Sequence, residues 1–424
     1  MIQSLFMILG TGEVFLEKHY RGKTSRQVCD FFWDEVSKRE NYEEVPPIMT
    51  MGRFYLLSIY RESMWLLSVV TTEVPPLLVF EFLHRIMDVF KDYFGTVDEL
   101  SLKENFSTVY QLLEEMMDNG YPLTTEPNAL KSMIKPPTMG LRLKQAATGA
   151  SMVVEDLPDV ASSAIPWRKT GVKYSNNEIF IDLVEEVDSI LDPNGQVVSS
   201  EVQGVVEVNC RLSGMPDLLL IFTEPELIDD CSFHPCVRYN RFERDKVVSF
   251  VPPDGKFELM RYRVNTPHLV VAPLFCTPQI NMPATSNNGS VNISLGKRTV
   301  TSLISKKKKN TITNVEVNFA FPKSVRTADL KGSTGEVIYD EAAKTVKWKV
   351  GKLHSNKNAS LTGALMLEGA RPEESPTLEL GWEVPMTSVS GLAISSLNMS
   401  NEKYTPYKGV RTITRAGKFQ VRTI

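Results

Sequence analysis

The chain has 424 residues, 42% of them hydrophobic, and a formal net charge of −4; this length predicts two or three domains with cores of their own. Its five cysteines are odd in number and too few for a disulfide framework, which favours a reducing compartment. No window approaches the roughly 20 apolar residues that span a bilayer, and the first residues lack the basic region and cleavage site of a signal peptide. We therefore expect a soluble cytoplasmic protein whose membrane contacts are peripheral.

The first part of the chain alternates short strands with helices. Two β-rich runs around the Gly-Thr-Gly sequence at 10–12 predict a hairpin, which a helix and further strands follow. Apolar residues at helical spacing predict helices over about 75–94 and 101–118, with Gly120 at the position of a C-terminal cap. The order ββαβββαα predicts a small α+β domain over residues 1–135.

The character of the sequence changes twice after this domain. Residues 136–170 are rich in small residues and lack a sustained period, which is typical of a linker. From residue 171 to 424, long β-rich runs follow one another without helices between them, which predicts an all-β, elongated sandwich. The Asp-Pro-Asn-Gly turn at 192–195 places the run 178–191 in a hairpin with 196–212.

A carboxylate interrupts the apolar run at the start of this hairpin. Alternate residues of a strand face opposite sides, so Phe180 and Asp182 share one face, and Ile179 and Ile181 share the other. An aromatic ring beside a carboxylate suits a tyrosine side chain, whose ring would stack on Phe180 while its hydroxyl donates to Asp182. The alternative is a structural ion pair between Asp182 and an arginine.

Nothing in the sequence favours an enzyme or a metal site. No Gly-x-Ser-x-Gly, His-Glu-x-x-His or similar reactive grouping occurs, and Glu185, Glu186 and Asp188 are expected on an exposed strand face. The Cys-x2-His-x-Cys run at 231–236 lacks the second cluster that a four-ligand zinc site needs. We predict no catalytic residue, no cofactor and no bound metal.

Charge is distributed unevenly along the chain. Residues 1–130 hold 11 Lys/Arg against 20 Asp/Glu, whereas residues 291–360 hold 14 Lys/Arg against 5 Asp/Glu. The basic region is either a solvated loop or a surface attracted to anionic lipid, which would contribute roughly 1 kcal/mol per lysine. The candidate lipid-facing residues are Lys306, Lys307, Lys308 and Lys309.

Several stretches resemble the medium (mu) subunits of the clathrin adaptor complexes. The hairpin "NEIFIDLVEEVDSIL", the segment "FHPCVRYNRFERDKVVSFVPPDGKFELMRYRV" and the end "YKGVRTITRAGKFQVRTI" resemble the mu homology domain. The runs "MIQSLFMIL" and "TTEVPPLLVFEFLHRIMDVFKDYFG" resemble the longin-like domain of the same subunits. The stretches "DLLLIFTEPELIDDCSFHPCVRY" and "AGKFQVRT", with Gly409, are similar to the branch found in adaptor protein complex three.

The resemblance implies recognition of Tyr-x-x-Φ sorting signals, in which Φ is a bulky apolar residue, in the cytosolic tails of membrane cargo. It further implies transport from the Golgi and endosomes to lysosome- or vacuole-type organelles, and a cytoplasmic protein peripheral on those membranes. The implied partners are a beta-type and a delta-type large subunit and a small sigma subunit, with no nucleic acid. The acidic N-terminal domain would be the module that assembles with these subunits.

Carried over from the family, Phe180, Asp182 and Arg411 would line the tyrosine pocket. The residues around the Φ pocket would be Ile179, Ile181, Ile394, Leu397, Val410 and the stem of Lys408. The peptide would pair with the main chain along about 409–413, which is the β-augmentation mode of peptide recognition.

The chain departs from the family pattern at two positions. Gly409 stands where endocytic members place a tryptophan, and Asn209 stands where they place a lysine. Both changes are expected to weaken or re-tune signal binding, and they favour one alternative, a structural coat subunit whose peptide groove has lapsed. In the linker, only Thr148 and Ser162 are nominal counterparts of the threonine that is phosphorylated in endocytic members.

Overall fold

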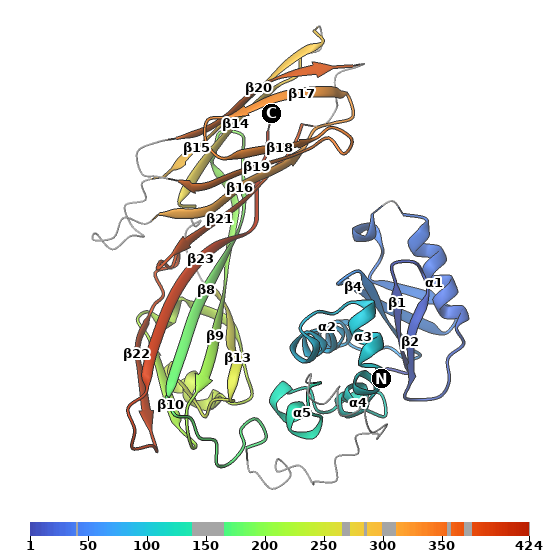
Figure 1. Cartoon of the computed structure of the whole chain (residues 1–424), viewed down its shortest axis with the longest axis vertical. Coiled ribbons are helices and arrows are strands. Elements are labelled where there is room, and N and C mark those ends of the chain that lie inside the picture. The colour runs from blue at the N-terminus through green and yellow to red at the C-terminus, as the bar shows by residue number, and fades with distance from the viewer. Residues whose placement is uncertain are drawn as a thin grey trace. The chain divides into compact units, whose positions relative to one another are not determined.

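The computed structural model describes residues 1–39, 41–137, 165–264, 272–283, 286–298, 311–353, 358–368 and 375–423. The chain forms two compact units, residues 1–169 and 170–424, which are described separately (Figure 1). The sequence predictions that lie outside the described residues concern most of the linker, 138–164, with Thr148 and Ser162, and the basic residues Lys306, Lys307, Lys308 and Lys309.

The first unit is built on a five-stranded sheet in the order β2-β1-β5-β4-β3. Its strands are β1 (Ser4–Leu9), β2 (Val14–His19), β3 (Ile48–Met51), β4 (Phe54–Arg61) and β5 (Met64–Val70). β1 and β2 pair antiparallel, which confirms the predicted hairpin. β4 and β5 also form a hairpin, whose turn residues Glu62 and Ser63 adopt positive φ angles of 51° and 62°.

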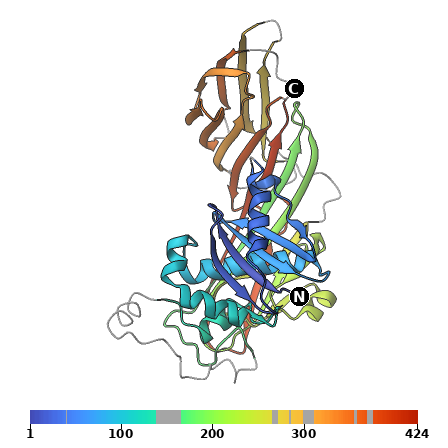
Figure 2. The same ribbon diagram turned by 90° about the vertical axis from the view of Figure 1, so that its right-hand side faces the viewer.

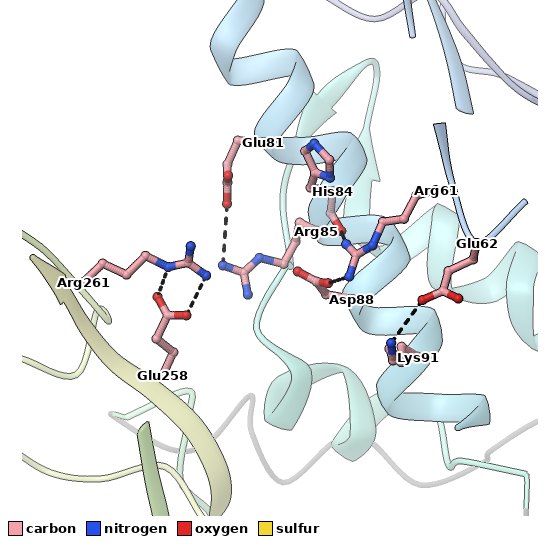
Figure 3. A network of polar contacts seen from close by, with 9 residues as sticks. All are labelled: Arg61, Glu62, Glu81, His84, Arg85, Asp88, Lys91, Glu258 and Arg261. Carbon is pink, nitrogen blue, oxygen red and sulfur yellow. Dashed lines mark hydrogen bonds and ion pairs between the residues drawn. The ribbon is translucent and has the colours of Figure 1, made fainter. Parts of the chain in front are cut away.

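Helices cover both faces of this sheet (Figures 1 and 2). They are α1 (Gln27–Ser37), α2 (Pro76–Phe94), α3 (Glu99–Glu104), α4 (Phe106–Met116) and α5 (Pro127–Met133). One core lies under α1, and a larger one lies between the opposite face and α2, α4 and α5. Arg61, the last residue of β4, forms an ion pair of 2.7 Å with Asp88 of α2, and Glu62 in the following turn forms one of 3.0 Å with Lys91 of α2 (Figure 3).

The prediction of a single helix over 101–118 is wrong. Asp98 caps α3, accepting from the Ser101 N–H at 2.7 Å, and Asn105 interrupts the helix by donating its side-chain amide to the Ser101 carbonyl at 2.7 Å. Gly120 is likewise no helix cap, because α4 ends at Met116. It occupies the turn between β6 (Met117–Asp118) and β7 (Tyr121–Pro122) with a φ of +82°.

The described residues of the second unit form three sheets. The nine-stranded sheet has the order β11 (Ile228–Phe233), β13 (Gly255–Val264), β9 (Val197–Arg211), β8 (Glu178–Leu191), β23 (Tyr407–Val421), β21 (Leu378–Pro385), β16 (Ile312–Ala320), β19 (Thr345–Leu353) and β18 (Glu336–Asp340). The smaller sheets are β12 (Val248–Phe250), β10 (Asp217–Phe222) and β22 (Ile394–Ser400), and β14 (Leu274–Asn281), β15 (Asn288–Lys297), β20 (Ala359–Leu367) and β17 (Val325–Gly332). One short helix, α7 (Tyr239–Asp245), lies between β11 and β12 in the chain.

Three long strands organise this unit (Figure 1). β8 and β9 form the predicted antiparallel hairpin, and Asp192 holds its turn by accepting from the N–H groups of Asn194 and Gln196 at 2.9 and 2.7 Å. β23, at the end of the chain, pairs with β8 in parallel. Within the described ranges, no helix is both long enough and apolar enough to cross a membrane.

Candidate functional site

The candidate site lies where β23 loses one of its two neighbours. β8 pairs with β23 from Tyr407 to Val421, whereas β21 pairs with β23 only from Ile413 onward, beginning opposite Pro385. In the described part of the chain, residues 407–412 therefore have no strand partner on the side away from β8. This open edge presents main-chain N–H and C=O groups that an extended peptide can pair with.

An ion pair lies on the outer face of the open edge. Arg411 and Asp182 are opposite each other in the register of β23 and β8, and Arg411 Nε donates to Asp182 Oδ1 at 2.7 Å while Nη2 donates to Oδ2. The hydrogen bond and the charge of Asp182 raise the pKa of the Arg411 guanidinium. The predicted alternative, an ion pair with an arginine, is therefore present. The ion pair leaves the Asp182 carboxylate able to accept a further hydrogen bond, because each of its oxygens has a second lone pair.

Phe180 lies beside this ion pair, on the same face. It is flanked in register by Gly409 on β23 and Asn209 on β9, so both departures from the family pattern adjoin the same ring. A Cβ atom at Gly409 would lie 2.5 Å from Phe180 Cδ1. The absence of a side chain at Gly409 thus allows the Phe180 ring to lie over β23, with 37% of the residue exposed.

The residues predicted for the Φ pocket come from the inner face of the same edge and from β22, which carries Ile394 and Leu397. Ile179 and Ile181 are fully buried, and Lys408 and Val410 are opposite them on β23. Lys408 Nζ donates to the Leu397 carbonyl at 2.7 Å, which ties the edge to β22. Val410 is 40% exposed and Leu397 only 7%, so the apolar surface reaches from the core to the edge. Ile394 begins β22, in register with Phe222 of β10.

The expectation that Glu185 is exposed is wrong, because its side chain is completely buried. Its carboxylate accepts from the N–H groups of Val389 and Ser390 at 2.8 and 3.1 Å and from the Ser388 hydroxyl at 3.0 Å. The Ser390 hydroxyl also donates to it. Thr414, opposite Glu185 on β23, donates its hydroxyl to the Thr387 carbonyl at 2.8 Å. Glu185 therefore holds residues 388–390, just after β21, against β8 through hydrogen bonds.

The position of this buried carboxylate sets the length of the open edge. The segment 386–393 carries the chain from β21 to β22, and Glu185 holds it at the level where β21 parts from β23. Burial, reinforced by the charge of Glu185, raises the pKa of Tyr262, whose hydroxyl lies 3.5 Å from Glu185 Oε1. The phenol therefore remains a neutral donor facing the carboxylate.

Glu186 and Asp188, the two carboxylates predicted to share the exposed face with Glu185, do lie on the outer face. Glu186 forms an ion pair with Arg415, whose Nε lies 2.7 Å from Glu186 Oε1, and Asp188 accepts from the Lys418 N–H at 2.6 Å. Their even numbers place them on the side of Phe180 and Asp182. The same alternation, applied to Glu185, was the signal in the sequence for its burial.

The Cys-x2-His-x-Cys run of β11 and the following loop contains ordinary structural contacts. His234 Nδ1 accepts from the Cys236 N–H at 3.1 Å, and burial raises the pKa of the Cys231 thiol. Among the described residues, no group of three or more His, Cys, Asp and Glu side chains could hold a metal ion.

Comparisons with known proteins cover the whole chain. The family model described as "Adaptor complexes medium subunit family" matches residues 165–423, and the one described as "Clathrin adaptor complex small chain" matches residues 1–136. AP-3 complex subunit mu-1 of Homo sapiens is 45% identical over 425 residues, and AP-3 complex subunit mu-2 of Homo sapiens is 43% identical. Both alignments cover 100% of this chain and 100% of the relative.

A structural comparison extends over both units. A chain of the structure described as "Homology model of the full-length AP-3 complex in an intermediate open conformation" has a TM-score of 0.59 and 16% sequence identity. It covers 100% of this chain and 100% of that chain. At this identity the likeness shows the fold alone.

Replacing Glu185 is expected to destabilise the second unit far more than replacing its neighbour Glu186. Glu185→Ala removes the carboxylate that accepts from the N–H groups of Val389 and Ser390 and from two serine hydroxyls, which should cost at least about 3 kcal/mol of unfolding free energy. Glu185→Gln should also destabilise the unit, because the side-chain NH2 group of glutamine would face N–H and O–H groups that now donate to the Glu185 carboxylate. Glu186→Ala removes only an exposed ion pair and should cost below about 1 kcal/mol.

The measurement is urea unfolding of the full chain, with hydrogen exchange of β8, β23 and residues 386–393 as the local readout. A Glu185→Ala protein within about 1 kcal/mol of the Glu186→Ala protein would contradict the role assigned to this carboxylate.

Proposed function

Since the chain belongs to the adaptor complexes medium subunit family, we propose that it binds Tyr-x-x-Φ sorting signals in the cytosolic tails of membrane cargo. Members of this family are structural and cargo-binding subunits rather than enzymes. The observation that carries the proposal is the open edge of β23 at 407–412. Its outer face carries an aromatic ring and an ion pair, and its inner face carries apolar side chains.

The spacing of the signal matches this arrangement. In an extended peptide, side chains three residues apart point to opposite faces, because the side-chain period of a strand is two. When such a peptide pairs with β23, its tyrosine lies on the face of Phe180, Asp182 and Arg411, and its Φ residue lies on the opposite face. If the tyrosine and the Φ residue were two or four residues apart, both side chains would lie on one face of the edge, and the residues on its other face would have no contact with the signal.

The outer face suits a tyrosine side chain in particular. The ring stacks on Phe180, and the hydroxyl donates to the Asp182 carboxylate, which the Arg411 guanidinium orients through two hydrogen bonds. Asp182 keeps 22% of its side chain exposed, so the hydroxyl can reach it. Asn209 offers a neutral amide on the β9 side of Phe180, which gives the pocket fewer positive charges than a lysine would.

The inner face suits a bulky aliphatic side chain. The Φ residue covers Val410, Leu397 and the stem of Lys408 above the buried Ile179 and Ile181. Burying one aromatic and one aliphatic side chain contributes roughly 1.5–3 kcal/mol each before ordering costs, which gives a modest affinity for a single signal. Retention at a membrane then depends on several contacts acting together.

We further propose that the first unit assembles with a beta-type and a delta-type large subunit and a small sigma subunit. This unit carries exposed apolar side chains at Ile48, Leu77, Leu78, Leu100, Phe106, Tyr121 and Leu123. Its acidic balance over residues 1–130 favours a partner of opposite charge. The complex would act on vesicles moving from the Golgi and endosomes to lysosome- or vacuole-type organelles, bound peripherally to anionic membranes.

The Asp182→Ala protein is expected to lose binding of a Tyr-x-x-Φ peptide by about 10- to 100-fold, the value of a hydrogen bond to a charged group. The full chain is titrated calorimetrically with a ten-residue peptide that carries the motif and with its Tyr→Ala twin. Glu186→Ala is the matched control, because it breaks a similar ion pair on the same face, beyond the open edge.

Unfolding midpoints accompany these titrations. Asp182→Ala should change the unfolding free energy by less than about 1 kcal/mol, because the ion pair with Arg411 is at the surface. Equal binding of the two peptides by the unaltered protein, or no binding at millimolar concentration, would support the structural coat subunit instead.

The Leu77→Asp, Leu78→Asp double variant is expected to reduce co-purification with the large subunits without destabilising the isolated chain. The two residues are 81% and 47% exposed in the first turn of α2, so the change leaves the core intact. Ile338→Asp, at a 44% exposed position of β18, is the control. If the double variant recovers the complex in full, the first turn of α2 does not contact the large subunits, and this part of the proposal is wrong.

A further inference from the structure

A third aromatic side chain stands on the outer face of the open edge. Alternate residues of β23 point to the same side, so Tyr407 shares this face with Gly409 and Arg411. Its ring centroid lies 5.7 Å from that of Phe180, at an interplanar angle of 54°. Tyr407 is 64% exposed, although it is in contact with another aromatic ring.

The three positions of β23 follow one another along the outer face of the edge. Phe180 lies over Gly409 in the middle, Tyr407 stands at one end, and Arg411 with Asp182 stands at the other. An outward side chain of a peptide paired with this edge would have the Phe180 ring beneath it. Its neighbours along the edge would be an aromatic ring on one side and an ion pair on the other.

We propose that Tyr407 is the aromatic wall of the tyrosine-binding pocket and determines its preference for an aromatic ring. This inference rests on the proposed function, since it concerns the same peptide. Gly409 supplies no side chain to hold the guest ring, and Tyr407, two residues away on the same face, supplies the missing aromatic contact. Sequence reasoning did not single out Tyr407.

The exposure of Tyr407 indicates that its ring borders the position of the guest ring. A ring that occupied this position itself, as a plug, would be buried on Phe180 and would point its hydroxyl at Asp182. Instead Tyr407 is 64% exposed, and both oxygens of Asp182 accept from Arg411. Tyr407 therefore borders the proposed position of the guest ring and does not fill it.

The wall and the carboxylate recognise different parts of the guest. Tyr407 contacts the ring, so it stabilises a tyrosine and a phenylalanine guest alike. Asp182 accepts from the hydroxyl, so it stabilises tyrosine alone. Aromatic pairs of this kind change affinity by about 2- to 10-fold beyond the area they bury. The two contributions can therefore be separated with three peptides that differ only in the aromatic residue.

The experiment titrates the full chain with peptides that carry Tyr, Phe or Ala at the signal position. Tyr407→Ala should weaken binding of the Tyr and Phe peptides by about 2- to 10-fold each and leave their ratio unchanged. Tyr407→Phe should bind like the unaltered protein. Asp182→Ala should remove the difference between the Tyr and Phe peptides.

Tyr239→Ala is the matched control. Tyr239 is 53% exposed, and its ring lies 6.1 Å from that of Phe233, outside the open edge. Unchanged affinity of Tyr407→Ala would overturn the wall, and tighter binding would show that Tyr407 is a plug. If the unaltered protein does not distinguish the Tyr and Ala peptides, the proposed function itself fails, and the inference fails with it.

Discussion

The parallel pairing of β8 with β23 is the constraint on which the rest of the second unit depends. It joins the first long strand of the unit to the last one and brings Arg411 opposite Asp182, 229 residues apart in the sequence. Because β8 occupies one side of β23 throughout, and β21 occupies the other side only from Ile413, an edge of 407–412 remains. The pairing with β8 thus holds residues 407–412 of β23 in place, while their other side remains free to pair with a peptide.

The two faces of β8 separate stability from recognition. Glu185 points inward, where several donors meet a buried carboxylate, and its removal would take away the acceptor that these donors share. Asp182 points outward, where a surface ion pair contributes little to folding but holds a carboxylate in a fixed orientation. Three residues apart on one strand, the two acids thus have different tasks because of the direction in which they point.

Local sequence patterns predicted local features of the fold, whereas only the family resemblance placed Arg411 near Asp182. The turn at 192–195 fixed the β8–β9 hairpin, and the family resemblance, confirmed by the comparisons, predicted an α+β longin-like domain followed by a mu homology sandwich. No local pattern indicates that β8 pairs with β23, because a parallel pair needs a crossover connection, which here spans most of the unit. Glu185 was misplaced because its charge outweighed the alternation that assigns it to the inner face. The break at Asn105 was missed because apolar spacing continues through it.

Amide hydrogen exchange of the full chain, with and without a Tyr-x-x-Φ peptide, tests the central claim most directly. The open edge predicts that bound peptide slows exchange within residues 407–412, while the amides of β8 and β9 stay unchanged. The Tyr→Ala twin of the peptide should leave exchange at this edge as it is in the free protein. Protection confined to another part of the surface, or equal protection by both peptides, would contradict the account.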